Sequence, residues 1–469
     1  MTTDLVKPSD LLPVLRDDLE AYDAELAGRR ADAVQGVLAA DGLEGVVRLA
    51  AVSGSPLAAG SALAMAQPTH DSEMTSWLAH AGDPSQGPRP DIAYAYVSAR
   101  LRGTDSAPVD AFLAMTDGPT GQALVLKAAG DPVDAWHRLT ELPSETTEQY
   151  WKRFSYYGLG NRFDRALDAV RGLLGAQRRA AALHMTVLYS KSLDTAEAAG
   201  VVADALEGLL ASGMDDPELM SLASHDYERL FALLDRHRAD VGEQRVVNLE
   251  WQLFPALGYQ ANAPALHGAL SDQPASFAEL VRYLYNPDGV GGPRDDDQPA
   301  DAEQRREIAS RAFSVLRSWR RCPATGPDRR ADPAALHAWV KQAREALTRD
   351  GRLGPGDSEI GQALAWAAPD DDGTYPPRAV RDLLEEVRSD RLDRGLEIGI
   401  YNRRGVTSRG VFEGGKKEDG LATQYRDAAA AAAGWPRTAK VLRRLSDSYE
   451  RDAEQIEGEA EGLRRGVYT

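Results

Sequence analysis

The chain has 469 residues, of which 43% are hydrophobic and 27% are charged. This balance is typical of a folded protein and excludes a disordered one. Lys and Arg total 54 against 72 Asp and Glu, which gives a net charge of −18. An acidic surface repels the phosphates of nucleic acids and of anionic lipids, so we do not expect nucleic acid or a membrane as the partner.

Cysteine usage and the N-terminal residues bear on the cellular location. Cys322 is the single cysteine, so the chain forms no internal disulfide and no cysteine-based zinc site. Residues 1–13 are polar and lack the apolar core of a signal peptide. No stretch approaches the roughly 18 apolar residues that a membrane span needs. We therefore expect a cytoplasmic protein.

Helical periodicity is the dominant signal along the chain. Apolar residues recur at i, i+3, i+4 and i+7 between breaks at Gly, Pro or Asp. In chain order, the predicted helices cover residues 11–26, 29–39, 43–52, 161–174, 177–189, 195–211, 217–235, 244–257, 264–270, 276–285, 302–319, 333–348, 377–387, 418–433 and 436–463. Residues 396–401 (Leu-Glu-Ile-Gly-Ile-Tyr) are predicted to form a short strand or extended lead-in.

The predicted fold is all-α. Helices with short connections pair as antiparallel neighbours and stack, and a chain of 469 residues exceeds what one hydrophobic core organises. We therefore predict an α-solenoid-like stack of antiparallel helix pairs. Residues 28–38 and 161–170 share a loose pattern of small, Arg and apolar positions. The pattern fits a degenerate helical repeat and no tetratricopeptide, ankyrin or leucine-rich consensus.

A composition change near residue 286 predicts a domain boundary. Residues 286–300 are rich in Gly, Pro and Asp, as flexible linkers are. They divide a predicted N-terminal helical-repeat stack at 1–285 from a C-terminal helical region at 301–469, which contains a basic, Gly-rich loop at 402–417.

The loop at 402–417 is a candidate binding site. It holds five basic residues and one acid within an acidic protein, and its glycines allow backbone N–H groups to point at an anion. The hypothesis is a site for an anion or an acidic partner, and the alternative is a solvated loop whose arginines pair with the chain's own carboxylates. The residues of the hypothetical site are Arg403, Arg404, Arg409, Lys416 and Lys417.

Nucleotide hydrolysis at this loop is not expected. Residues 410–417 nearly match a P-loop, but Lys417 stands where the magnesium-binding Ser or Thr should be. The preceding strand that a P-loop requires is also missing, because the candidate strand ends near Tyr401.

Other candidate sites carry no recognisable chemistry. None of the eight histidines precedes Glu, so the zinc-protease pattern is absent. Cys322 follows two arginines that would raise its reactivity if it were exposed, but its position before Pro323 favours a structural role at a helix end. The acidic runs 295–297 and 370–372 lack the ligand spacing of a calcium loop. We predict no catalytic residue, no metal and no cofactor.

An aromatic cluster spans residues 150–157. The composition predicts a helix core with its exit turn, and the alternative is a protein–protein interface, because Trp, Tyr and Arg dominate binding hot spots. The residues of this alternative are Tyr150, Trp151, Arg153, Tyr156 and Tyr157.

Three stretches, residues 150–185, 247–285 and 396–454, carry a family resemblance. They include Tyr-Trp-Lys-Arg from position 150, Val-Asn-Leu-Glu-Trp from position 247 and Gly-Ile-Tyr-Asn-Arg-Arg-Gly from position 399. Together they resemble the helical C-terminal region of large bacterial multidomain proteins, some of which resemble anti-phage defence proteins. In those proteins a helical arm that resembles a sensor follows an effector or nucleotide-switch domain.

The resemblance implies a function in binding and supplies no catalytic residues. We expect a non-enzymatic scaffold or sensor subunit that binds a protein partner, either freestanding or as an arm separated from its effector. The alternative is a nucleotide-binding or nucleic-acid-binding protein that uses the loop at 402–417. A hydrolase has no positive support in the sequence.

Overall fold

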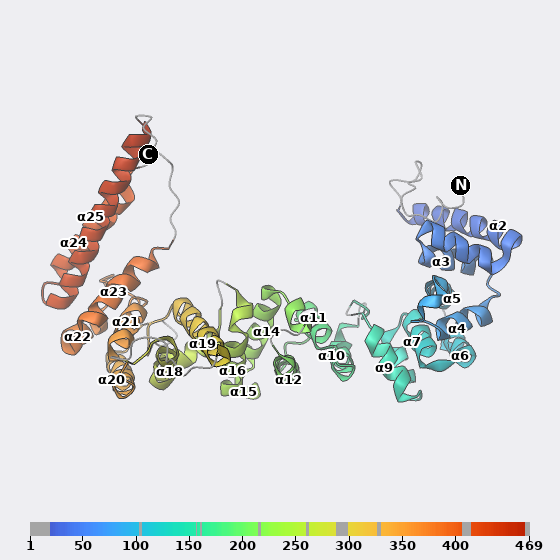
Figure 1. The fold of residues 1–469 in the computed structure, drawn as a ribbon, viewed down its shortest axis with the longest axis horizontal. Coiled ribbons are helices and arrows are strands. Elements are labelled where there is room, and N and C mark those ends of the chain that lie inside the picture. The colour runs from blue at the N-terminus through green and yellow to red at the C-terminus, as the bar shows by residue number, and fades with distance from the viewer. Residues whose placement is uncertain are drawn as a thin grey trace. The chain divides into compact units, whose positions relative to one another are not determined.

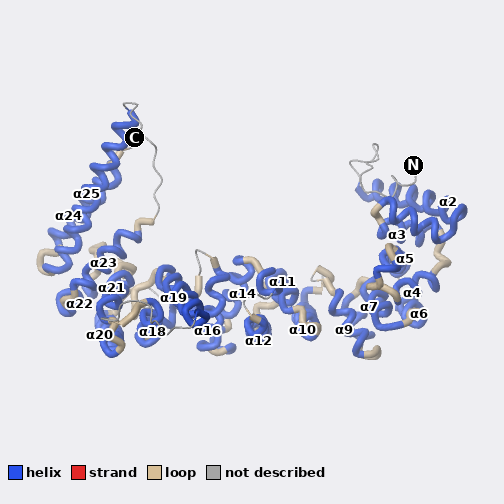
Figure 2. Tube along the Cα trace, viewed as in Figure 1, coloured by secondary structure: helices blue, strands red, loops and turns tan. Residues whose placement is uncertain are grey.

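The computed structural model describes residues 19–102, 106–155, 157–159, 162–213, 217–258, 262–287, 299–325, 330–405 and 414–464. Contacts divide the chain into two compact units, unit 1 (Met1–Leu233) and unit 2 (Leu234–Thr469). Within the described ranges the named elements are all helices (Figures 1 and 2). The one β-type contact there is an isolated bridge between Thr325 and Ala331. The all-α prediction is confirmed for these residues.

Unit 1 consists of helices that pack largely against near neighbours in the chain. They are α2 (Leu19–Ser53), α3 (Pro56–Ala66), α4 (Asp71–Ala79), α5 (Arg89–Leu101), α6 (Ser106–Met115), α7 (Gly118–Ala128), α8 (Pro132–Leu139), α9 (Ser144–Arg153), α10 (Ala166–Gly175), α11 (Arg179–Leu188), α12 (Ala196–Ser212) and α13 (Pro217–Ser221), with 3-10 turns η1 (Pro84–Gln86) and η2 (Phe163–Arg165). α14 (Ser224–Arg236) crosses the boundary between the units.

Local sequence explains where several of these helices begin and bend. The Asp131 carboxylate accepts the backbone N–H of Val133 at 2.9 Å and caps α8, and the Thr195 hydroxyl caps α12 in the same way. α2 is kinked at Gly42, whose φ of 65° suits glycine. α2 continues through Gly28, where a break is predicted, so the first helix boundary is wrong.

Unit 2 contains the remaining helices. They are α15 (Arg238–Val241), α16 (Glu243–Leu253), α17 (Pro264–Asp272), α18 (Pro274–Leu284), α19 (Pro299–Ser318), α20 (Pro333–Arg349), α21 (Leu353–Leu364), α22 (Arg378–Val387), α23 (Asp390–Arg403), α24 (Lys416–Ala431) and α25 (Pro436–Arg464), with the 3-10 turn η3 (Phe254–Leu257). The α21–α23 and α24–α25 pairs share the most extensive contacts within the unit.

The predicted strand at residues 396–401 is wrong, because this segment lies inside α23. The Ser389 hydroxyl caps the helix by accepting the N–H of Leu392. Leu396 and Ile400, one helical turn apart, are both buried. A Cβ atom on Gly395 would overlap the carbonyl oxygen of Ser358, so α23 approaches the backbone of α21 at a distance that only glycine permits.

The division between the units lies at Leu233–Leu234, well before the predicted boundary near residue 286. Helices on both sides of that predicted linker share one core within unit 2. Phe277 of α18 packs against Trp319 and Trp339, with ring centroids 5.8 and 5.2 Å apart. Residues 288–298 of the predicted linker lie outside the described residues.

No helix in the described ranges is both long enough and apolar enough to cross a membrane.

Candidate functional site

The basic loop at 402–417 directs two of its five cations into the protein itself. The Arg404 guanidinium pairs with the buried carboxylate of Glu418 at the start of α24. The Arg403 guanidinium donates to the Ala365 carbonyl oxygen at 2.5 Å and lies 4.8 Å from the ring centre of Tyr375. These are internal contacts of the kind that the alternative interpretation of the loop predicts.

The glycine end of the loop also faces the chain's own carboxylate. The N–H of Gly415 donates to the Glu457 carboxylate at 3.1 Å. Lys416 and Lys417 follow at the start of α24 and are exposed. Arg409 and the first part of the P-loop-like sequence fall within residues 406–413, which lie outside the described residues.

The aromatic segment at 150–157 contributes mainly to the core of unit 1. Tyr150 and Trp151 are buried, Trp151 with 9% of its surface exposed. Trp151 lies 5.0 Å from Phe154 and 5.4 Å from Trp136 between ring centroids, and burial raises the pKa of Tyr150. This burial places both side chains in the core of unit 1, as the helix-core interpretation expects.

The other members of that hypothetical interface lie differently. Arg153 is half-buried and donates to the Gln149 carbonyl oxygen of its own helix at 3.2 Å. Tyr157 is 68% exposed, and Tyr156 lies outside the described residues.

Two groups with potential nucleophilic or basic chemistry, Cys322 and His267, are buried. Burial raises the pKa of the Cys322 thiol to about 12, in keeping with a structural cysteine. His267 lies 3.0 Å from the Ser318 hydroxyl, and burial lowers its pKa to about 4. Because that hydroxyl donates to the Val315 carbonyl, His267 is the donor in this contact and is not placed as a base. Within the described residues, no group of three His, Cys, Asp or Glu could hold a metal ion.

A hollow of about 450 Å³ opens beside α22, but its charged walls pair with one another. Among its lining residues, Arg330 pairs with Asp371, and Arg378 forms an ion pair with Asp382 at 3.4 Å. Such internal pairing leaves little charge to orient a ligand.

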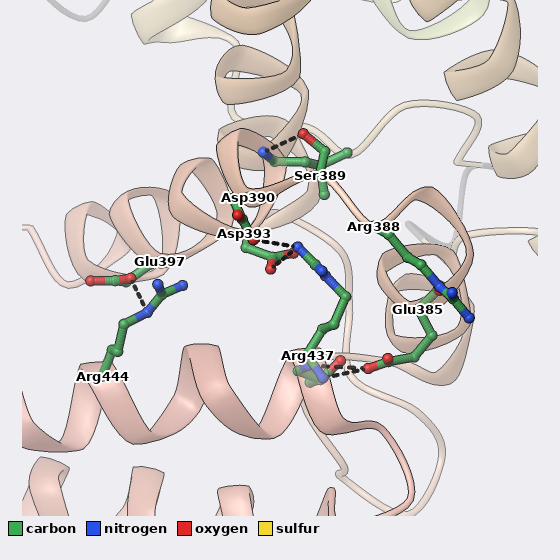
Figure 3. A network of polar contacts seen from close by, with 10 residues as sticks. Glu385, Arg388, Ser389, Asp390, Asp393, Glu397, Arg437 and Arg444 are labelled. Carbon is green, nitrogen blue, oxygen red and sulfur yellow. Dashed lines mark hydrogen bonds and ion pairs between the residues drawn. The ribbon is translucent and has the colours of Figure 1, made fainter.

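A polar network joins α22, α23 and α25 in unit 2 (Figure 3). The Arg437 guanidinium donates to Asp390 at 2.8 Å and contacts the Asp393 carboxylate at 2.7 Å. The Glu385 carboxylate accepts the backbone N–H groups of Arg437 and Thr438 at the start of α25, at 2.7 and 3.3 Å. Negative charge at a helix start is favourable, so the network fixes α25 at its first turn.

The same network continues one helical turn further along α23. Arg444 lies 2.9 Å from Glu397 in an ion pair, and Arg394 pairs with the same carboxylate. Asp393 is 2% exposed, and burial raises its pKa although Arg437 opposes the shift. Each of these carboxylates therefore faces an arginine, and the pairs Arg437–Asp393 and Arg444–Glu397 join α25 to α23.

The network is incompletely satisfied. Asp393 Oδ1, Thr438 Oγ1 and Arg437 Nε are buried without a hydrogen-bond partner. Buried polar atoms that lack partners reduce stability. The network therefore fixes the relative position of α23 and α25 but adds less net stability than a fully hydrogen-bonded network would.

An exposed aromatic stack on unit 2 is the feature that sequence reasoning missed. Tyr283 of α18 is 41% exposed and stacks on half-buried Trp251 of α16, with ring centroids 6.0 Å apart and planes inclined by 24°. The Arg311 guanidinium of α19 lies 5.4 Å from the Trp251 ring centre. The three residues are far apart in the sequence, so no local pattern signals the stack.

The chain matches no known family model, no curated protein and no solved structure in the three comparisons made.

Proposed function

We propose that this chain is a non-enzymatic helical scaffold or sensor subunit that binds a protein partner through the surface of unit 2. The observation that carries the proposal is the exposed stack of Tyr283, Trp251 and Arg311. Trp, Tyr and Arg are the residues that most often dominate the energy of protein interfaces. From the resemblance noted above, we further propose a role in bacterial anti-phage defence.

The three side chains of the stack are held in place because each comes from a different packed helix. Rings held by packing lose little conformational entropy when a partner binds, so more of the contact energy contributes to affinity. An arrangement of repeated helix pairs, which we propose for the chain as a whole, would extend such a surface beyond one contact point.

The experiment is affinity co-purification of the tagged full chain from its own cells. We expect a discrete protein at a fixed ratio to the chain, lost when Trp251→Ala and Tyr283→Ala are combined. Phe163→Ala is the matched control, because Phe163 is also an exposed aromatic side chain but belongs to unit 1. Undiminished capture by the double variant, with an unchanged circular dichroism spectrum, would show that the stack is not the binding surface.

The alternative is nucleotide or nucleic-acid binding through the loop at 402–417. The described part of that loop offers less support for binding than the stack does. Arg403 and Arg404 contact groups of the protein, and the Gly415 N–H faces Glu457. The geometry therefore favours protein binding at the stack.

A further inference from the structure

We propose that the stack receives an acidic segment of the partner, whose carboxylate pairs with Arg311 while a neighbouring apolar side chain packs on Tyr283. This inference rests on the proposed function and names the chemistry of the partner. It commits to a protein carboxylate rather than to a nucleic acid phosphate.

Arg311 differs from two other arginines of α18 and α19. Arg317 of the same helix pairs with Glu359 at 2.7 Å, and Arg282 of α18 pairs with Asp350 at 3.3 Å. Within the described part of the chain, Arg311 forms no such ion pair, and its buried Nε has no acceptor. A guanidinium that is held against an indole and lacks a carboxylate has the complementary charge for an incoming acid.

Two acids next to the stack, Glu279 and Glu307, do not pair with Arg311. The Glu279 carboxylate accepts the Tyr283 hydroxyl at 2.7 Å. Glu307, one turn before Arg311 on α19, attracts the guanidinium without forming an ion pair with it. On α16, before Trp251, the Gln244 side chain donates to Asn248 at 3.0 Å.

Burial makes a carboxylate at Arg311 more effective than one at an exposed arginine. Packing against neighbouring helices lowers the pKa of Arg311, because the guanidinium loses part of its hydration. An arriving carboxylate restores a partner for a charge that water solvates incompletely. Charge-assisted hydrogen bonds of this kind are stronger than neutral ones, and their loss should weaken binding by roughly tenfold or more.

The test is selection from a library of random dodecapeptides displayed on phage, with the full-length chain as the immobilised target. Parallel selections use Arg311→Met, Arg311→Lys and Trp251→Ala. Arg320→Met is the matched control, because the Arg320 guanidinium also lies over an indole, 5.9 Å from Trp366, at another place on unit 2. A defined peptide from the selection is then titrated against each variant by calorimetry.

The expected result is enrichment of peptides in which Asp or Glu adjoins an apolar residue. Affinity should fall roughly tenfold or more in Arg311→Met and in Trp251→Ala, fall less in Arg311→Lys, and be unchanged in Arg320→Met. The decrease with Arg311→Met should be somewhat smaller at high salt, since Arg311 is only partly buried and salt screens a charge pair that water still reaches.

Three results would overturn the inference. Peptides without carboxylates that still depend on Trp251 would leave protein binding intact but remove its acidic character. Acidic peptides that bind equally well to Arg311→Met would remove the proposed contact. Failure to enrich any acidic peptide, with Arg311-dependent binding of a single-stranded 20-nucleotide DNA, would assign the stack to nucleic acid. The co-purification experiment separately decides the proposed function.

Discussion

The two units of this chain use charge in different ways. Unit 1 has 33 Asp and Glu against 19 Lys and Arg, a net charge of −14, whereas unit 2 has 39 against 35, a net charge of −4. Among the described residues, unit 1 buries one carboxylate, that of Asp226, while unit 2 buries several. The buried acids of unit 2 are Glu250, Asp357, Glu359, Asp393, Glu397 and Glu418.

Several arginines of unit 2 pair with its buried carboxylates. Arg344 pairs with Asp357 and Arg317 with Glu359, in both cases between two helices, and Arg404, just after α23, pairs with Glu418 of α24. Buried pairs contribute less net stability than apolar packing of similar size, but breaking one is costly. Unit 1 also has ion pairs between helices, such as Arg89–Glu44 and Arg100–Asp71, but their carboxylates are partly or largely exposed. We infer that buried charge pairs help to set which helices meet in unit 2 more than in unit 1.

The largest expected effect tests the closest helix contact of unit 2. Gly395→Val places side-chain atoms where the Ser358 carbonyl of α21 lies, so we expect a loss of about 3 kcal/mol or more. Peptide-resolved hydrogen exchange should show faster exchange in unit 2 and unchanged exchange in unit 1. Gly354→Ala is the control, because nothing lies near that glycine of α21. Equal destabilisation of both units would contradict the division at Leu233–Leu234.

The second prediction compares a buried charge pair with an exposed one. Arg437→Met leaves Asp393 buried without its guanidinium, and we expect a loss of about 3 kcal/mol in urea unfolding. The exposed pair of Arg48 and Asp41 in unit 1 provides the control, because Arg48→Met should cost under about 1 kcal/mol.

A double variant makes that comparison sharper. Arg437→Met combined with Asp393→Leu removes both charges, so its stability should recover relative to Arg437→Met alone. If the two substitutions instead add, the Arg437 side chain contributes through packing and not through charge.

Sequence periodicity predicted the long amphipathic helices of the chain well. The predicted segment 333–348 corresponds to α20 (Pro333–Arg349), and 436–463 corresponds to α25 (Pro436–Arg464). The predicted segments left out α3 to α8, α21 and α23. In α3, for example, the sequence Pro-Leu-Ala-Ala-Gly-Ser-Ala-Leu-Ala-Met-Ala has no polar face, so it shows no alternation of apolar and polar residues at the helical period.

The features that depend on tertiary contacts could not be predicted. The alternation at 396–401 resembles a strand, but Leu396 and Ile400 are buried on one face of a helix. The loop arginines were recognised as a cluster, whereas their carboxylate and carbonyl partners, such as Glu418 and Ala365, come from other segments. The stack needs three helices from separate parts of the chain, and only the fold brings them together.

The third prediction concerns pH and Glu250, which is fully buried in unit 2. Burial raises its pKa to about 7, although the carboxylate accepts the N–H groups of Ala265 and Leu266 at the start of α17. A raised pKa means that the folded state binds this proton more tightly than the unfolded state. The contribution of Glu250 to stability therefore increases as pH falls from above 7 towards 4.5.

The measurement is urea unfolding at pH 8 and pH 5.5. Glu250→Gln should remove a pH-dependent gain of about 2 kcal/mol. His267 has the opposite effect on the pH dependence of stability. Because its pKa is lowered to about 4, its contribution makes the protein less stable as pH decreases from 6.5. Each variant is therefore compared with wild type at both pH values. Parallel pH profiles for wild type and Glu250→Gln would contradict the assignment.

The smallest effects are expected at the basic loop, where the comparison between internal and surface charge can be made within one segment. Arg404 pairs with buried Glu418, so Arg404→Met should cost about 2 kcal/mol. Lys416 is exposed at the start of α24, where a cation is mildly unfavourable, so Lys416→Ala should change stability by under about 0.5 kcal/mol.

Thermal unfolding and partner capture are measured on both variants and on the combined Arg403→Ala, Arg404→Ala, Arg409→Ala variant. We expect the triple variant to unfold several degrees earlier and to retain capture by the stack. Loss of capture at unchanged stability would instead show that these arginines bind the partner at the surface. The charges of this segment of unit 2 would then be exposed, as most charges of unit 1 are.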